Sequence, residues 1–167
     1  SRSDHLEVQD IRFDGDRTLF FNEACQTYSH QAGGRCSSLV AVDVITKKVR
    51  WRSAALRSNN AFLLHGDTII TGYGFTGEAG GLFVLNQSDG RQIGHRPLFR
   101  GVHPGNIHDA LAIVGDTLHV GLYDAGEDLR FRLDGFDGSS PRLTLSGQVP
   151  QEKRERFKRP KLSAATK

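Results

Sequence analysis

Short apolar stretches that run into a Gly-Asp turn and out into a second apolar stretch recur three times along this chain of 167 residues. The copies read FDGDRTLFF, LHGDTIITGY and IVGDTLHVGLY, and their aspartates, Asp16, Asp67 and Asp116, recur every 49 to 51 residues. Short apolar runs bounded by Gly, Asp and Asn predict β-strands, and the Gly-Asp pair predicts a tight hairpin between them. A fixed period of this length is typical of repeat proteins, including β-propellers.

The same patterning predicts four strands in each of three units. The predicted strands are residues 6–13, 18–22, 38–44 and 49–53, then 61–64, 68–73, 81–86 and 92–97, then 110–114, 117–123, 129–133 and 142–146. No segment of the first 149 residues shows an apolar stripe of helical period. We therefore predict an all-β, β-propeller-like fold of three four-stranded antiparallel blades, at about residues 5–54, 55–101 and 102–149.

Three blades make only a partial propeller, because propellers usually close with about four to eight blades. Two flanks would then stay open, and we expect each to present an apolar sheet face that needs cover. The cover is either the remaining blades of a longer propeller or a second copy of the chain, which would complete a six-bladed ring as a homodimer. The longer propeller is preferred, because the chain begins at Ser1 without Met and the strands begin almost at once.

Charge is distributed unevenly between the repeats and the end of the chain. The whole chain carries a net charge of +3, but residues 151–167 contain seven Lys or Arg and two Glu, so residues 1–150 are mildly acidic. Residues 150–167 are predicted to be a basic tail without a fixed structure. Nucleic-acid binding through this tail is an alternative function, although a solvated tail is the favoured interpretation and nucleic acid an unfavoured partner. No apolar stretch is long enough for a membrane span.

The two cysteines, Cys25 and Cys36, flank a loop that contains two glycines. Because the strands on either side are predicted to be antiparallel, a disulfide that closes this loop is one interpretation, and a pair of reduced thiols is the other. The disulfide would place the chain in an oxidising compartment, periplasmic or extracellular. The loops after the second strands, at residues 23–37, 74–80 and 124–128, differ in length, and variable loops on a rigid scaffold commonly carry function.

One turn matches a known repeat motif. Ala41, Asp43, Thr46 and Trp51 follow the pattern A-x-D-x-x-T-G-K-x-x-W, with Lys47 at the position of the Gly. The chain thereby resembles the tryptophan-docking repeats of pyrroloquinoline-quinone-like β-propellers over about residues 5–146. The second unit repeats the motif more loosely, with a Gly at the Gly position (Gly90) and Gly94 in place of the Trp. We interpret the four residues as structural, since an Asp can accept bonds from turn amides and a Trp offers a broad apolar surface between sheets.

The resemblance implies two kinds of function. Quinoprotein dehydrogenases of the family hold the quinone with a calcium site and adjacent cysteines, whereas Cys25 and Cys36 are separated and no calcium-binding set is recognisable. The family also includes a propeller lipoprotein of the outer-membrane protein assembly machinery that uses no cofactor. We therefore expect a non-catalytic binding or scaffold module for protein partners, without metal or cofactor. A quinoprotein-type dehydrogenase, or another propeller enzyme with a channel site, is the alternative.

A channel or loop site, in either case, has four candidate residues. His103, His108 and Asp109 lie close together just before the first predicted strand of the third unit, and Tyr73 ends the second strand of the second unit. The histidine cluster sits on a Gly/Pro loop without an obvious fourth ligand, so polar loop residues are preferred over a zinc site.

Overall fold

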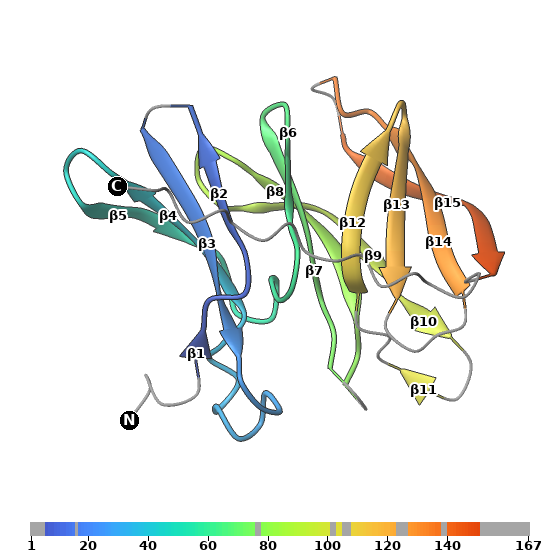
Figure 1. The fold of residues 1–167 in the computed structure, drawn as a ribbon, viewed down its shortest axis with the longest axis horizontal. Coiled ribbons are helices and arrows are strands. Elements are labelled where there is room, and N and C mark those ends of the chain that lie inside the picture. The colour runs from blue at the N-terminus through green and yellow to red at the C-terminus, as the bar shows by residue number, and fades with distance from the viewer. Residues whose placement is uncertain are drawn as a thin grey trace, which may run out of the picture.

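The computed structural model describes residues 6–15, 17–75, 78–100, 103–104, 108–122, 127–137 and 140–150. Its strands form three antiparallel blades that stand side by side in chain order (Figure 1). Blade 1 consists of β1 (Leu6–Glu7), β2 (Ile11–Asp14), β3 (Thr18–Cys25), β4 (Ser38–Asp43) and β5 (Lys48–Arg52). Blade 2 consists of β6 (Leu63–His65), β7 (Thr68–Tyr73), β8 (Gly81–Asn86) and β9 (Gln92–Pro97). Blade 3 consists of β12 (His108–Val114), β13 (Thr117–Leu122), β14 (Glu127–Asp134) and β15 (Arg142–Pro150).

The predicted all-β class with three four-stranded antiparallel sheets is confirmed. Blades 2 and 3 are meanders in which consecutive strands pair, and in blade 1 both β1 and β2 pair with β3. Hairpin turns at Gly15, Gly66 and Gly115 join β2 to β3, β6 to β7 and β12 to β13. Gly66 and Gly115 have φ of 54° and 58°, so glycine supplies the left-handed conformation that these hairpin turns require. Figure 1 shows these turns along one edge of the molecule and the loops after β3 and β7 along the opposite edge.

The first predicted strand, residues 6–13, is wrong as a single element. It is interrupted between β1 and β2, and both parts pair with β3. The reason is Asn22, a buried side chain on β3 whose Oδ1 accepts hydrogen bonds from the backbone amides of Gln9 (2.9 Å) and Asp10 (3.0 Å). These amides therefore bond to a side chain instead of the backbone ladder, and the strand breaks there.

Other strand limits also differ from the prediction. A short pair, β10 (Phe99–Arg100) with β11 (His103–Pro104), links blades 2 and 3 and was not predicted. Strands β14 and β15 are longer than predicted, and β15 continues to Pro150. The predicted tail beyond that residue lies outside the described residues.

Two apolar clusters join the blades. The cluster between blades 1 and 2 contains Phe20, Leu39, Ile69 and Leu85 among its buried residues, and the cluster between blades 2 and 3 contains Ile70, Val84, Leu118 and Phe131 among its own. Blade 2 is thus buried on both faces, as its all-buried strand β7 indicates. The core therefore lies between sheets, which is the packing of neighbouring propeller blades. Within the described residues no helix is long and apolar enough to cross a membrane.

Candidate functional site

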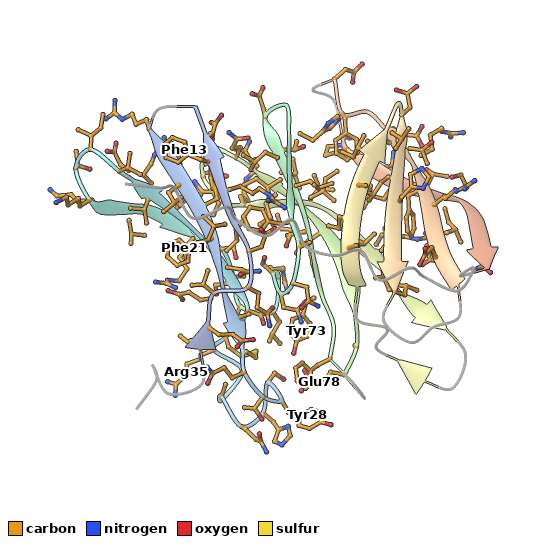
Figure 2. The ribbon with its side chains drawn as sticks, in the orientation of Figure 1. Phe13, Phe21, Tyr28, Arg35, Tyr73 and Glu78 are labelled. Atoms are coloured by element: carbon orange, nitrogen blue, oxygen red, sulfur yellow. A yellow bond between two sulfur atoms is a disulfide. The ribbon has the colours of Figure 1, made fainter. Side chains whose placement is uncertain are left out.

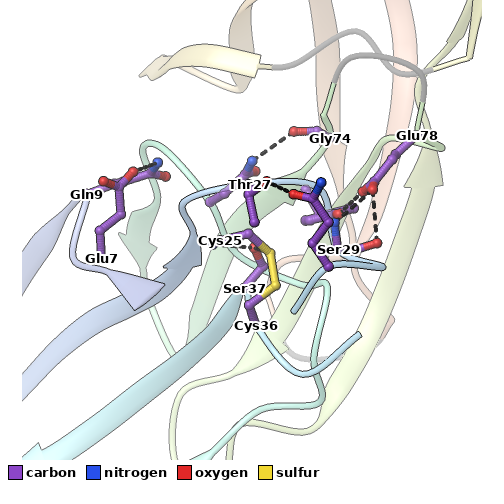
Figure 3. Close-up of a disulfide and its surroundings, with 12 residues drawn as sticks. Glu7, Gln9, Cys25, Thr27, Ser29, Cys36, Ser37, Gly74 and Glu78 are labelled. Atoms are coloured by element: carbon purple, nitrogen blue, oxygen red, sulfur yellow. Dashed lines mark hydrogen bonds between the residues drawn. A yellow bond between two sulfur atoms is a disulfide. The ribbon is translucent and has the colours of Figure 1, made fainter. Parts of the chain in front are cut away.

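The loop after β3 is closed by a covalent bond. Cys25 and Cys36 form a disulfide with a Cα–Cα distance of 5.1 Å, and both residues are buried (Figure 3). Ser37, at φ 57°, places its Oγ 3.3 Å from the Cys25 amide, from which it accepts a hydrogen bond. The disulfide interpretation from the sequence is confirmed. The loop between the cysteines consequently has few conformations available, and it presents its side chains from a fixed base.

Glu78 connects this closed loop to blade 2. Its Oε1 accepts hydrogen bonds from the Ser29 amide (2.8 Å) and the Ser29 hydroxyl (3.0 Å), and its Oε2 accepts one from the Tyr73 hydroxyl (Figures 2 and 3). Burial, followed by the hydrogen bond to Glu78, raises the pKa of Tyr73 well above its ordinary value. Tyr73 is therefore a neutral donor at physiological pH. One carboxylate thus holds the loop of blade 1 against the loop of blade 2.

An aromatic cluster lies on the same loops. The Tyr28 ring packs edge-on against Phe75, with 5.0 Å between ring centroids, and stacks on His30 at 5.7 Å. Tyr28 remains 38% exposed, although Phe75 contacts its ring from the side of blade 2. We call the surface formed by Tyr28, His30, Phe75 and Glu78 the loop face. It combines exposed aromatic rings with a fixed backbone, which is the chemistry of a protein-binding surface.

Away from the loop face, Trp51 of blade 1 packs against the turn between β8 and β9 of blade 2. Its Nε1 donates a hydrogen bond to the Gln87 carbonyl at 3.1 Å, and its ring packs against Phe20 at 5.7 Å. Gly90 lies directly against the ring, because a Cβ there would be 2.4 Å from Trp51 Cε3. On the turn before Trp51, Asp43 Oδ1 accepts the amide hydrogens of Ile45 and Thr46. The Thr46 amide and the Arg17 side chain lower the pKa of Asp43 to about 2.

A cavity of about 380 Å³ opens between blades 1 and 2 near the Gly-Asp turns. Its lining includes Arg50, which donates to Thr18 Oγ1 at 2.8 Å, and Gln87, which donates to Asp14 Oδ2 at 2.6 Å. The Gln87–Asp14 bond joins blades 2 and 1, whereas Arg50 and Thr18 both belong to blade 1. Among the described residues, Gln87 Oε1 is buried without a hydrogen-bond partner, but the cavity has no exposed aromatic ring in its lining, so the loop face is the stronger candidate for a site.

Of the four residues that the sequence suggested for a site, the structure describes one side chain. Tyr73 ends β7, is buried and bonds to Glu78. His103 lies in β11, and His108 and Asp109 begin β12, but their side chains lie outside the described part of the molecule. In the part that is described, no group of three His, Cys, Asp or Glu side chains is placed to hold a metal ion.

The sequence did not single out Tyr28, Phe75 or Glu78. Only the lengths of the loops after the second strands pointed to this region, and loop length does not reveal which side chains meet. Ser29 and Glu78 are 49 residues apart in the chain, so their contact depends on how two blades pack.

Comparison with known proteins shows the fold alone. No family model matches the sequence, and no curated protein matches it. Among solved structures, the chain is similar to the crystal structure of BamB from Moraxella catarrhalis, with a TM-score of 0.54 and 15% sequence identity. The match covers 86% of this chain and 38% of that protein, so the chain spans less than half of the length of its structural neighbour. The similarity supports a propeller-like fold with part of a ring.

Proposed function

We propose that this chain is a non-catalytic binding module that holds a protein partner on its loop face. The observation that carries the proposal is the exposed Tyr28 ring, which Phe75 and His30 support on a disulfide-closed loop. Tyrosine is enriched among the residues that contribute most to protein–protein affinity, in part because its ring loses little conformational freedom on binding. The disulfide further supports work in an oxidising compartment, periplasmic or extracellular.

The loop face suits a partner with apolar and basic groups. The Tyr28, His30 and Phe75 rings offer apolar contact area, and the Glu78 carboxylate contributes a negative charge beside them. The hydrogen bonds from Ser29 and Tyr73 fix that carboxylate before a partner arrives, so little ordering remains to be done on binding. The similarity to BamB supports the propeller scaffold and does not identify the partner.

A phage-displayed random peptide library provides the probe. Peptides are selected on the whole 167-residue chain, and their dissociation constants are measured for the natural chain and for variants by isothermal titration calorimetry. We expect Tyr28→Ala to weaken the selected peptides about tenfold or more, since truncation of a central interface residue usually costs above 1 kcal/mol. Val114→Ala is the control, because Val114 is 67% exposed and lies in blade 3.

Two outcomes contradict the proposal. One is that the library yields no peptide that binds the folded chain. The other is that selected peptides bind the Tyr28→Ala and Val114→Ala variants equally well, which would place binding elsewhere on the molecule.

A further inference from the structure

The outer blades expose faces of opposite chemistry. For each blade we call the face toward the preceding blade its leading flank and the face toward the following blade its trailing flank. Among the described residues, no blade packs against the leading flank of blade 1 or the trailing flank of blade 3. The sequence predicted two apolar open flanks, and this holds for only one of them.

The leading flank of blade 1 is apolar where β2 pairs with β3, and the Glu23–Arg52 ion pair lies farther along the same face. Strand register pairs Ile11 with Phe21 and Phe13 with Leu19, so these four side chains share one face of β2 and β3. Figure 2 labels Phe13 and Phe21 on this blade. Ile11 is 53% exposed and Phe13 50% exposed, and Val49 on β5 adds a side chain that is 55% exposed. Exposed apolar residues are unremarkable when scattered, but a contiguous set on one sheet face marks an interaction surface.

The repeat shows what covers such a face. Leu19, Ile69 and Leu118 each follow the Thr that begins the second strand of their blade, so they occupy the same position in the repeat. Ile69 is buried against blade 1, and Leu118 is buried against blade 2. At this position, therefore, the leading flank packs against a preceding blade in both joints that the structure shows. The partner surface in those joints is a trailing flank with Phe20 or Ile70 at its centre.

The trailing flank of blade 3 has different chemistry. His119 occupies the position of Phe20 and Ile70, and Arg130, opposite His119 on β14, is exposed. Arg132 shares β14 and forms a salt bridge with Asp134 at 2.6 Å. A second copy that closed a ring with this chain would bring Arg130 and the Arg132–Asp134 pair against Ile11 and Phe13, where apolar side chains cannot replace the lost hydration of the charges. A second copy is therefore a poor match for the leading flank of blade 1.

The residue that stands where blade 1 has Trp51, which we call the docking position, restricts which blade can pack against blade 1. Gly90 accepts Trp51 from blade 1 only because it has no Cβ. The corresponding residue of blade 1 is Lys47, which also has a positive φ of 57° but carries a side chain. A tryptophan from a preceding blade cannot occupy the same site, because the Cβ of Lys47 would overlap its ring. A small residue avoids this overlap. Gly94 holds the tryptophan's position in blade 2, where an added Cβ would lie 3.0 Å from the Pro141 carbonyl oxygen, so a residue without a side chain fits between neighbouring blades there.

We propose that the leading flank of blade 1 binds a further four-stranded propeller blade from outside this chain. The trailing flank of this further blade is apolar, and the blade has a small residue at the position that Trp51 occupies in blade 1. The inference is independent of the loop face, since it rests on the residues of the blade joints.

The first measurement uses the natural chain. Its solution mass and its binding of the dye bis-ANS are compared with those of Phe13→Lys on the leading flank and Val114→Lys on the trailing flank of blade 3. We expect a monomer whose dye fluorescence falls several-fold in Phe13→Lys and stays unchanged in Val114→Lys. A stable dimer that Phe13→Lys dissociates would overturn the proposal, because a second copy would then be the occupant.

The second measurement supplies the blade. In the first protein, a copy of residues 55–101, which has Gly94 at the docking position, is joined ahead of the whole chain. In a matched second protein, a copy of residues 5–54, which has Trp51 at that position, is joined ahead of the whole chain instead. We expect the first addition to suppress dye binding and protect the joint from protease, and the second to do so only when Lys47→Gly is also present in the original blade 1. If the first addition leaves dye binding unchanged, or the second protects equally well without Lys47→Gly, the proposal is wrong.

Discussion

Replacement of Gly90 by Ala tests whether the contact between blades 1 and 2 depends on the close approach of Trp51. Gly90 has φ 72°, and a Cβ there would lie 2.4 Å from Trp51 Cε3, a separation that cannot be accommodated without movement. The ring must withdraw from the turn, and its hydrogen bond to the Gln87 carbonyl and its packing against Phe20 are then lost or weakened.

The magnitude follows from three contributions. A β-carbon in the left-handed region costs about 1–2 kcal/mol. The lost hydrogen bond contributes about 0.5–1.5 kcal/mol, and the weakened aromatic pair contributes about as much again. We therefore expect Gly90→Ala to lower the free energy of unfolding by about 2–5 kcal/mol. Gly66→Ala is the matched control, because Gly66 has φ 54° but no atom within 4 Å of an added Cβ. It should lose only the backbone contribution of about 1–2 kcal/mol.

Urea unfolding followed by circular dichroism gives both values. Trp51 is the single tryptophan of the chain, so a shift of its fluorescence to longer wavelength reports directly that the ring has left the joint. A double-mutant cycle with Trp51→Ala isolates the contact, since Gly90→Ala should cost no more than Gly66→Ala once the ring is absent. Equal losses for Gly90→Ala and Gly66→Ala in the natural background would refute the reasoning.

Two further predictions concern the same pair of blades. Removal of the disulfide by Cys25→Ser and Cys36→Ser should lower the free energy of unfolding by about 3 kcal/mol, the value expected for a bond that closes a short loop. Urea unfolding of the variant, and of the natural chain with and without reductant, measures the loss, and an unchanged midpoint would contradict the role given to the disulfide. Because the pKa of Asp43 is lowered to about 2 from 3.8, its contribution to stability is present above pH 3.8 and is lost as the pH falls toward 2. Asp43→Asn, which is the residue of blade 2 at this position, should flatten the fall in thermal midpoint between pH 4 and pH 2, and an equally steep fall would contradict it.

The strands could be predicted because each carries its own local signal. The Gly-Asp pairs mark the hairpins, and the apolar runs on either side mark the paired strands, so the predicted and observed second strands begin at the same residues, Thr18, Thr68 and Thr117. The break in the first strand could not be predicted from such a signal. It depends on the buried amide of Asn22, whose partners are set by the pairing of β1 and β3.

The loop face could not be predicted from the sequence for a similar reason. In the sequence Glu78 is one polar loop residue among several, and only the packing of blade 2 beside blade 1 brings its carboxylate to Ser29. Tyr73 was singled out, but as a channel residue near three side chains of the third unit, whereas the structure shows its hydroxyl bonded to Glu78. Contacts between blades determine the site, and a repeat pattern encodes them only indirectly.

The difference in polarity between the two open flanks, by contrast, can be recognised in the sequence once the strand register is known. Position for position, the second strands read Phe20, Ile70 and His119 on the trailing flank. Hydrophobic patterning alone did not reveal the difference, because strand alternation says which residues share a face and not which face meets a neighbour. Since β3 carries Phe21 on the leading flank and ends at Cys25, a blade that docks on this flank would set its own loops beside the disulfide loop. The covering blade would then extend the loop face, so the flank and the loop face would act as one binding surface made by neighbouring blades.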